Sequence, residues 1–228
     1  MILLHFSVLL FLVAGNLSAQ TLKSKVRAQE ECGPLAAQVL RCPKYGFTYQ
    51  VIFGWVDRTA DMQQDESLPD ESESQSPKET SREADHPQPA SSKSSKTLLA
   101  VFERPPAAPG ETINSAVVIA AEPLANYHGI KTAADYFSPI TELAEQRGFK
   151  VVNEPYVFGL GAKQLVRGDY SKERGKLTMW QTSLVMIEKG NIVSFTFIGG
   201  GEDEVNDLIS DLVFRATRSN SQIPKDKK

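Results

Sequence analysis

Side chains that carry out chemistry are scarce in this chain of 228 residues. Histidine occurs at three positions, His5, His86 and His128, and cysteine at two. The motifs H-E-x-x-H and G-x-S-x-G are absent, and no serine, histidine and aspartate can be grouped into a triad from their spacing. We therefore expect a protein that is not an enzyme and that holds no cofactor and no metal ion.

An excess of positive charge is also missing. The 25 lysines and arginines are outnumbered by 28 aspartates and glutamates, which gives a net charge of -3 and a pI near 5.7. Binding to nucleic acid requires a basic patch or stripe on the surface. We therefore expect no nucleic-acid partner, and the charge gives no reason to expect adsorption to an anionic membrane.

The amino-terminal apolar run is too short to span a membrane comfortably. Residues 2–14 read ILLHFSVLLFLVA, whereas a spanning helix takes about 20 residues. Small residues precede a cleavage point after Ala19, as in a secretory signal peptide. We expect residues 1–19 to be removed, leaving a secreted or periplasmic protein with no stable membrane insertion. The first residues contain no lysine or arginine, so a retained membrane anchor stays open as the alternative.

The two cysteines, Cys32 and Cys42, both lie in the part predicted to be exported. A cysteine pair close in sequence in such a chain most often forms a disulfide. A metal pair or a redox pair is the alternative, but further metal ligands are not near and the spacing is not C-x-x-C. We predict a structural bridge within an amino-terminal segment, residues 20–45.

Two stretches have the composition of disordered chain. Residues 62–96 are rich in serine, aspartate, glutamate and proline and contain no aromatic residue, so they cannot bury enough apolar surface to offset their ordering entropy. We predict a disordered acidic insertion there, most simply a solvated loop. Binding of a partner or of calcium by its carboxylates is the alternative. The tail, residues 218–228, is also predicted to be disordered.

The remaining chain, residues 46–217, is predicted to form one domain interrupted by that insertion. Alternating apolar residues predict a half-buried strand that contains Phe47, Tyr49, Val51, Phe53 and Trp55. Two more strands follow the insertion, the second with a central run, residues 116–121, that is apolar on both faces and is expected to lie in mid-sheet. Four strands follow residue 148, and the short turns between them, such as Lys189–Asn191, predict antiparallel pairing.

Two amphipathic helices complete the predicted order β-β-β-α-β-β-β-β-α. The first is expected to begin near Thr132, with Asp135 as a capping partner, to be kinked at Pro139 and to end at Gly148. The second is predicted from the spacing of Val205, Leu208, Ile209, Leu212 and Val213. The fold class is therefore α+β, with a central, mostly antiparallel sheet covered by helices.

Two short motifs have an obvious functional interpretation that the neighbouring residues disfavour. The glycines of FIGGGEDEVNDL could cradle phosphate, but Glu202, Asp203 and Glu204 in the first helical turn would repel an anion. We interpret Gly199–Gly201 as a strand-to-helix turn, with weak cation binding as the alternative. The tripeptide Arg167–Asp169 matches an adhesion motif, but it adjoins a strand pattern, so we expect a strand end with Gly168 in a bulge.

The order of these elements resembles the PsbP-like superfold, which includes PsbP and DcrB-like proteins. The resemblance covers residues 46–56 and 98–217 and is carried by GFTYQVIFGW, LLAVFE, SAVVIAAE and LTMWQTSLVMIEKGNIVSFTF. It implies an α/β/α sandwich with two main helices, no common enzymatic activity, and a role as an exported accessory or protein-binding module whose partner is unknown. The alternative function is a small-ligand binder or hydrolase with a pocket beside the sheet, for which the candidates are Arg167, Asp169, Tyr170 and Gln181.

Overall fold

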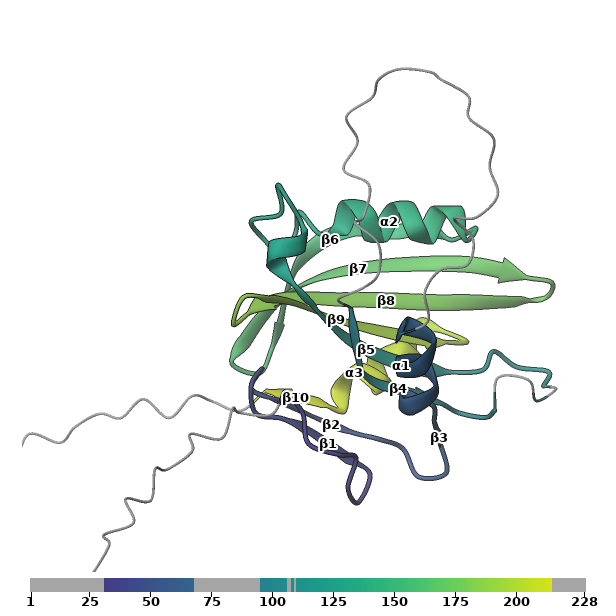
Figure 1. The fold of residues 1–228 in the computed structure, drawn as a ribbon. Coiled ribbons are helices and arrows are strands. Elements are labelled where there is room, and N and C mark those ends of the chain that lie inside the picture. The colour runs from purple at the N-terminus through teal and green to yellow at the C-terminus, as the bar shows by residue number, and fades with distance from the viewer. Residues whose placement is uncertain (1–30, 68–94, 106–107, 109, 215–228) are drawn as a thin grey trace, which may run out of the picture.

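The computed structural model describes residues 31–67, 95–105, 108 and 110–214 (Figure 1). The predicted signal peptide, most of the predicted insertion and the predicted tail lie outside the described residues. The insertion was predicted to begin at residue 62, and this is wrong for its first residues, because helix α1 spans Thr59–Ser67. Helix α1 is tied to the sheet, since the Thr59 hydroxyl accepts a hydrogen bond from the Ala100 N–H at 2.9 Å.

A seven-stranded antiparallel sheet forms the centre of the fold, which confirms the α+β class. Its strand order is β3-β4-β5-β9-β8-β7-β6. The strands are β3 (Val56–Asp57), β4 (Lys96–Phe102), β5 (Ala116–Pro123), β6 (Lys150–Leu160), β7 (Lys163–Arg174), β8 (Leu177–Glu188) and β9 (Asn191–Gly199). The predicted hairpin turn between β8 and β9 is confirmed, because Lys189 and Gly190 both have positive φ, 51° and 73°. Strand β5 lies in mid-sheet, as its apolar run predicts.

A second sheet, which the sequence analysis did not foresee, packs against one face of the first. It has the order β1-β2-β10, with β1 (Val39–Cys42), β2 (Phe47–Gln50) and β10 (Leu212–Phe214). Phe47 of this sheet meets Phe195 of β9 edge to face at 5.0 Å between ring centroids. Since β1 pairs with β2, the predicted boundary at residues 45 and 46 falls inside a hairpin rather than between two segments.

Two predicted elements are cut short by this second sheet. The strand predicted over residues 47–55 ends at Gln50, and the chain then turns and enters the large sheet at Val56. The last helix, α3, spans Glu202–Ser210, so Leu212 and Val213 belong to β10 instead of to the helix. Val213 is 54% exposed, because strand alternation turns it away from the core.

The large sheet separates two apolar layers (Figure 1). Helix α2 (Phe137–Gln146) covers one face, with its Phe137 in a cluster that includes Val185 and Ile192. Helix α3 and the three-stranded sheet cover the other face, where Leu184 of β8 and Phe195 of β9 point. The predicted sandwich with two main helices is not confirmed in that form, since one outer layer is a sheet combined with a helix.

The first predicted helix begins five residues later than expected. Thr132 and Asp135 do form the predicted pair, since Asp135 Oδ2 accepts the Thr132 N–H at 2.8 Å, but they close a turn that precedes the helix. Pro139 lies in the first turn of α2, where its missing N–H would have had no helical partner, so the predicted kink is not required. The predicted stop is confirmed: Gly148 has a φ of 81° just after the helix. A 3-10 turn, η2 (Leu124–Asn126), follows β5.

Candidate functional site

The four predicted pocket residues lie on opposite faces of the large sheet. Arg167 and Asp169 of β7 point toward the layer of α3 and the small sheet, because Leu165, two residues before Arg167, belongs to that core. Tyr170 points to the α2 face, where it packs with Ala144. Gln181 is the cross-strand partner of Tyr170 and therefore shares its face. The structure thus brings these residues together in two pairs and not in one pocket.

Arg167 and Asp169 form a buried polar cluster that ties three strands together. Their side chains are 7% and 3% exposed, and the Arg167 Nε donates to Asp169 Oδ1 at 2.8 Å. Asp169 also accepts hydrogen bonds from the Thr182 hydroxyl at 2.6 Å and from the Asn153 amide at 3.1 Å. These bonds satisfy the carboxylate, which a buried charge requires.

Gly168 lies between these two residues in the middle of β7, which corrects its predicted place at a strand end, whereas the β6–β7 ladder does shift register opposite it, between Asn153 and Tyr156. Its pairing with Ser183 continues the regular β7–β8 ladder. A Cβ at this position would lie 2.6 Å from the Phe137 ring of α2, so only glycine leaves room for the helix. The Arg-Gly-Asp tripeptide is consequently buried in a strand and is not presented on a loop.

On the other face, Tyr170 joins β7 to helix α2. Its hydroxyl lies 2.9 Å from the Thr141 hydroxyl of α2, and burial raises the pKa of its phenol. A tyrosine that is harder to ionise is a poor general base. Tyr170 therefore positions α2 on the sheet, and the half-buried Gln181 lies beside it.

The Gly199–Gly201 corner is the predicted turn between β9 and α3. Glu204, in the first turn of α3, accepts the Gly200 N–H at 2.7 Å and also bonds the Ser115 hydroxyl. A Cβ on Gly199 would come within 3.2 Å of the Glu204 carboxylate, so the glycine allows this close approach. Glu204 therefore holds the glycine corner that precedes its helix and anchors the helix to the segment before β5.

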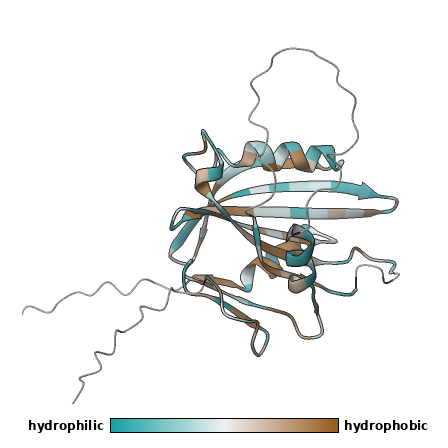
Figure 2. Ribbon diagram, viewed as in Figure 1, coloured by the Kyte–Doolittle hydropathy of each residue, from teal (hydrophilic) through white to brown (hydrophobic). Residues whose placement is uncertain are grey.

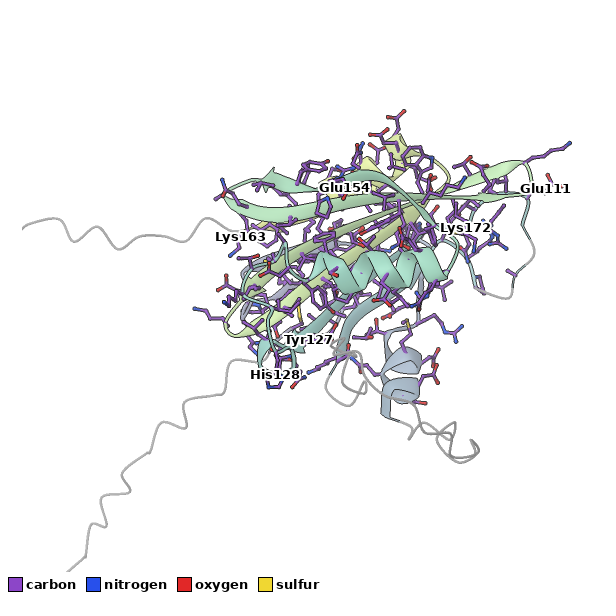
Figure 3. All side chains as sticks on the ribbon, turned by 90° about the horizontal axis from the view of Figure 1, so that it is seen from above. Glu111, Tyr127, His128, Glu154, Lys163 and Lys172 are labelled. Carbon is purple, nitrogen blue, oxygen red and sulfur yellow. A yellow bond between two sulfur atoms is a disulfide. The ribbon has the colours of Figure 1, made fainter. Side chains whose placement is uncertain are left out.

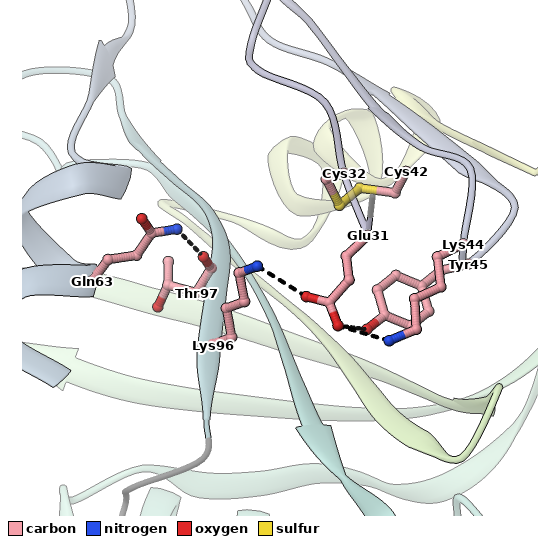
Figure 4. Close-up of a disulfide and its surroundings, with 8 residues drawn as sticks. All are labelled: Glu31, Cys32, Cys42, Lys44, Tyr45, Gln63, Lys96 and Thr97. Atoms are coloured by element: carbon pink, nitrogen blue, oxygen red, sulfur yellow. Dashed lines mark hydrogen bonds and ion pairs between the residues drawn. A yellow bond between two sulfur atoms is a disulfide. The ribbon is translucent and has the colours of Figure 1, made fainter. Parts of the chain in front are cut away.

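The predicted disulfide between Cys32 and Cys42 is present and lies beside a cluster of charges (Figure 4). Glu31 accepts hydrogen bonds from Lys44 at 2.7 Å and pairs with Lys96 at 3.0 Å. The bond from Lys44 is the main cause that lowers the pKa of Glu31 to about 2. Because Lys96 begins β4, Glu31 links the disulfide segment to the large sheet.

A second polar cluster, which the sequence analysis missed, holds the loop after β5. The Tyr136 hydroxyl donates to Glu122 at 2.7 Å, and Tyr127 bonds the same carboxylate. Burial, followed by the bond to Glu122, raises the pKa of Tyr127 to about 12. Figure 3 shows Tyr127 next to His128, which is exposed. The only sequence signal for this cluster is that two tyrosines and a glutamate lie within fifteen residues.

Exposed apolar side chains gather at the turn between β2 and β3. Ile52 and Phe53 are 42% and 87% exposed and adjacent, and Figure 2 colours this turn as hydrophobic. The turn is fixed, because the Trp55 N–H donates to the Ile52 carbonyl at 3.3 Å and Trp55 packs against the core. Alternation along the sequence predicted Phe53 to be buried, and the structure corrects this.

Two clefts, of about 310 and 290 Å³, are lined by residues other than the four predicted ones. The larger lies at the Gly200–Glu204 corner and includes Glu103 and Thr178, and the smaller lies beside the disulfide and includes Lys96. Among the described residues, no group of three or more histidine, cysteine or acidic side chains is placed to hold a metal ion. In the same part of the chain, no helix is long and apolar enough to cross a membrane.

Among known proteins, no family model and no curated protein matches this sequence. Cyanobacterial PsbP of Synechocystis matches in structure, with 12% identity, a TM-score of 0.41, and coverage of 80% of this chain and 95% of its own. A Pseudomonas aeruginosa protein of unknown function matches with 19% identity and a TM-score of 0.35, over 49% of this chain and 80% of its own. LpqN of Mycobacterium tuberculosis, involved in cell envelope biogenesis, has 15% identity and a TM-score of 0.30, over 50% and 65%. With these TM-scores below 0.5, the likenesses assign neither a family nor a function to this chain.

Proposed function

We propose that this protein is an exported, non-enzymatic accessory module of the cell envelope that binds a protein partner. The observation that carries the proposal is the pair of exposed apolar side chains, Ile52 and Phe53, on the fixed turn between β2 and β3. Exposed apolar residues that adjoin one another and are held in place are typical of protein interaction sites.

The free energy available from burying Phe53 supports a role in binding a protein partner. Full burial of a phenylalanine side chain is worth about 1.5–3 kcal/mol, and Phe53 is 87% exposed, so nearly all of this remains for a contact with a partner. The Gly54 φ of 86° and the packing of Trp55 fix the turn before any partner arrives. A fixed turn loses little conformational entropy on binding.

Two features support export. The Cys32–Cys42 disulfide belongs to a class of bond that forms and persists in oxidising compartments. The sequence also carries the predicted signal peptide over residues 1–19, with a retained anchor as its alternative. The element order that resembles the PsbP-like superfold agrees with an accessory role, and the net charge of -3 supports a partner other than nucleic acid.

A photo-crosslinking amino acid at position 53 tests the proposal in the cells that make the protein. Position 143 in α2 is the matched control, because Leu143 is also a large exposed apolar residue, at 47%, and belongs to a helix on the opposite face of the sheet. We expect a discrete crosslinked protein from position 53 that position 143 does not give. The same products from both positions, or none from position 53, would refute the proposed surface.

The substitution Phe53→Ser provides the complementary test. We expect it to abolish capture of the crosslinked partner and to change the free energy of unfolding by less than about 0.5 kcal/mol, because an exposed side chain makes few contacts to lose. Urea unfolding of the variant measures the second quantity. Unchanged capture by a normally folded variant would exclude a role for this side chain.

A further inference from the structure

Arg167 is buried in the sheet while most of its hydrogen-bonding capacity is unused. Its side chain is only 7% exposed, and a guanidinium group carries five N–H bonds. Within the described part of the chain, only its Nε donates a hydrogen bond, to Asp169. The Nη1 and Nη2 atoms have no acceptor there, and neither is sealed from solvent. Because solvent reaches both atoms, they are free to donate to an acceptor from solution.

The orientation of the guanidinium is fixed from two directions. The group lies over the Phe158 ring, at 5.2 Å from its centroid, and its Nε is held by Asp169. Asp169 is itself fixed by the Thr182 hydroxyl at 2.6 Å and by the Asn153 amide. The Nη atoms therefore form a preorganised fork with little rotational freedom left to lose on binding.

We propose that the Nη atoms of Arg167 bind the carboxylate of a small monocarboxylic acid, with Tyr156 at the entrance. The two parallel N–H donors of a guanidinium match the two oxygens of a carboxylate. Tyr156 lies across the β6–β7 ladder from Arg167, and its ring and the Phe158 ring provide apolar surface for the hydrocarbon part of the acid. This site goes beyond the proposed binding of a protein partner and does not depend on it.

The charges around Tyr156 favour an acid with a single negative charge. The Tyr156 hydroxyl donates to Asp169 Oδ2 at 3.5 Å. Burial, followed by the negative charges of Asp169 and Glu202 and opposed by Arg167, raises the pKa of Tyr156, so both carboxylates act on this side chain. Asp169 already neutralises the charge of Arg167. The carboxylates of Asp169 and Glu202 would repel a doubly charged phosphate more strongly than an anion with a single negative charge, such as a monocarboxylate.

Titration of the full chain with sodium butyrate, followed by NMR of arginine Nε–H groups and tyrosine rings, tests the site. We expect saturable shifts at Arg167 and Tyr156. Butanamide, a neutral analogue of the same shape, should give none, and inorganic phosphate should bind more weakly. Absence of saturation up to tens of millimolar butyrate, an equal response to butanamide, or tighter binding of phosphate would each overturn the proposal.

Two variants and a control test whether butyrate binding depends on the Nη atoms of Arg167. Arg167→Lys keeps the charge but removes the paired donors, and we expect at least about a tenfold loss of butyrate affinity. Arg174→Lys, at the exposed end of β7, should bind normally. Since Arg167→Lys could disturb folding, Tyr156→Trp is the second variant. It keeps Arg167 and Asp169, removes the hydroxyl that donates to Asp169 at 3.5 Å and narrows the entrance, so it should weaken binding. Wild-type affinity in both folded variants would overturn the assignment.

Discussion

Glu31 stabilises the contact between the disulfide segment and the large sheet through its two lysine partners, Lys44 at 2.7 Å and Lys96 at 3.0 Å. The hydrogen bond from Lys44 is the main cause that lowers the pKa of Glu31 from 4.5 to about 2, against the opposing effect of burial. At about 1.36 kcal/mol per pKa unit this shift corresponds to roughly 3 kcal/mol. Because the side chain is 27% exposed, solvent screening reduces the expected contribution to about 1 kcal/mol.

The sign of the pH dependence follows from the lowered pKa. A carboxylate with a folded-state pKa below its unfolded value stabilises the fold above the unfolded value, and the stabilisation is lost as the pH falls through the folded one. The contribution of Glu31 should therefore be complete above about pH 5 and should disappear between pH 4.5 and about 2. In Glu31→Gln, this pH-dependent part should be absent.

Urea unfolding of the wild type and of Glu31→Gln, from pH 7 to pH 2, measures the difference. We expect the variant to be less stable by about 1 kcal/mol at pH 7 and equal to the wild type near pH 2. Glu111→Gln is the matched control, because Glu111 is exposed and forms no ion pair with the described residues (Figure 3). A difference that stays constant over this range, or that is absent at pH 7, would refute the assigned role of Glu31.

Two further substitutions test the packing of the fold. Gly168→Ala should reduce the free energy of unfolding by about 1–3 kcal/mol, because its Cβ would overlap the Phe137 ring, whereas Gly159→Ala, with no atom within 4 Å, should have little effect in the same urea titration. Replacement of both Cys32 and Cys42 by serine should destabilise the protein by about 2–3 kcal/mol, since the bond closes a loop with a sequence separation of 10. A thermal melt of oxidised and reduced wild type provides the independent check, and equal melting temperatures would contradict the second estimate.

The polar cluster of β7 shows which parts of the candidate site could be predicted from the sequence. Arg167 and Asp169 were predicted as polar residues of a pocket beside the sheet, and the structure places these two in contact. Their partners Asn153 and Thr182 come from the two neighbouring strands, and only the β-ladder decides which residues lie opposite one another. Tyr170, one residue after Asp169, was grouped with them but points to the other face, because side chains alternate along a strand.

Local interactions along the chain allowed turns, several strands and helices, and the disulfide to be predicted from the sequence. Turn residues such as Gly190 and Gly148 mark where a hairpin closes and where a helix stops, because they accept positive φ without strain. Apolar periodicity located the mid-sheet strand β5 and the buried face of α3. The position of the two cysteines in the predicted exported part indicated the disulfide.

Only the tertiary structure decided where the second sheet forms. Its strands are residues 39–42, 47–50 and 212–214, and the pairing of β2 with β10 joins segments too far apart for any periodicity to reveal. This pairing ends the strand at Gln50 and the helix at Ser210, and it leaves Phe53 in solvent. The alternation from Phe47 to Trp55 was correct about which residues are apolar, but backbone pairing across the chain determined which of them are buried.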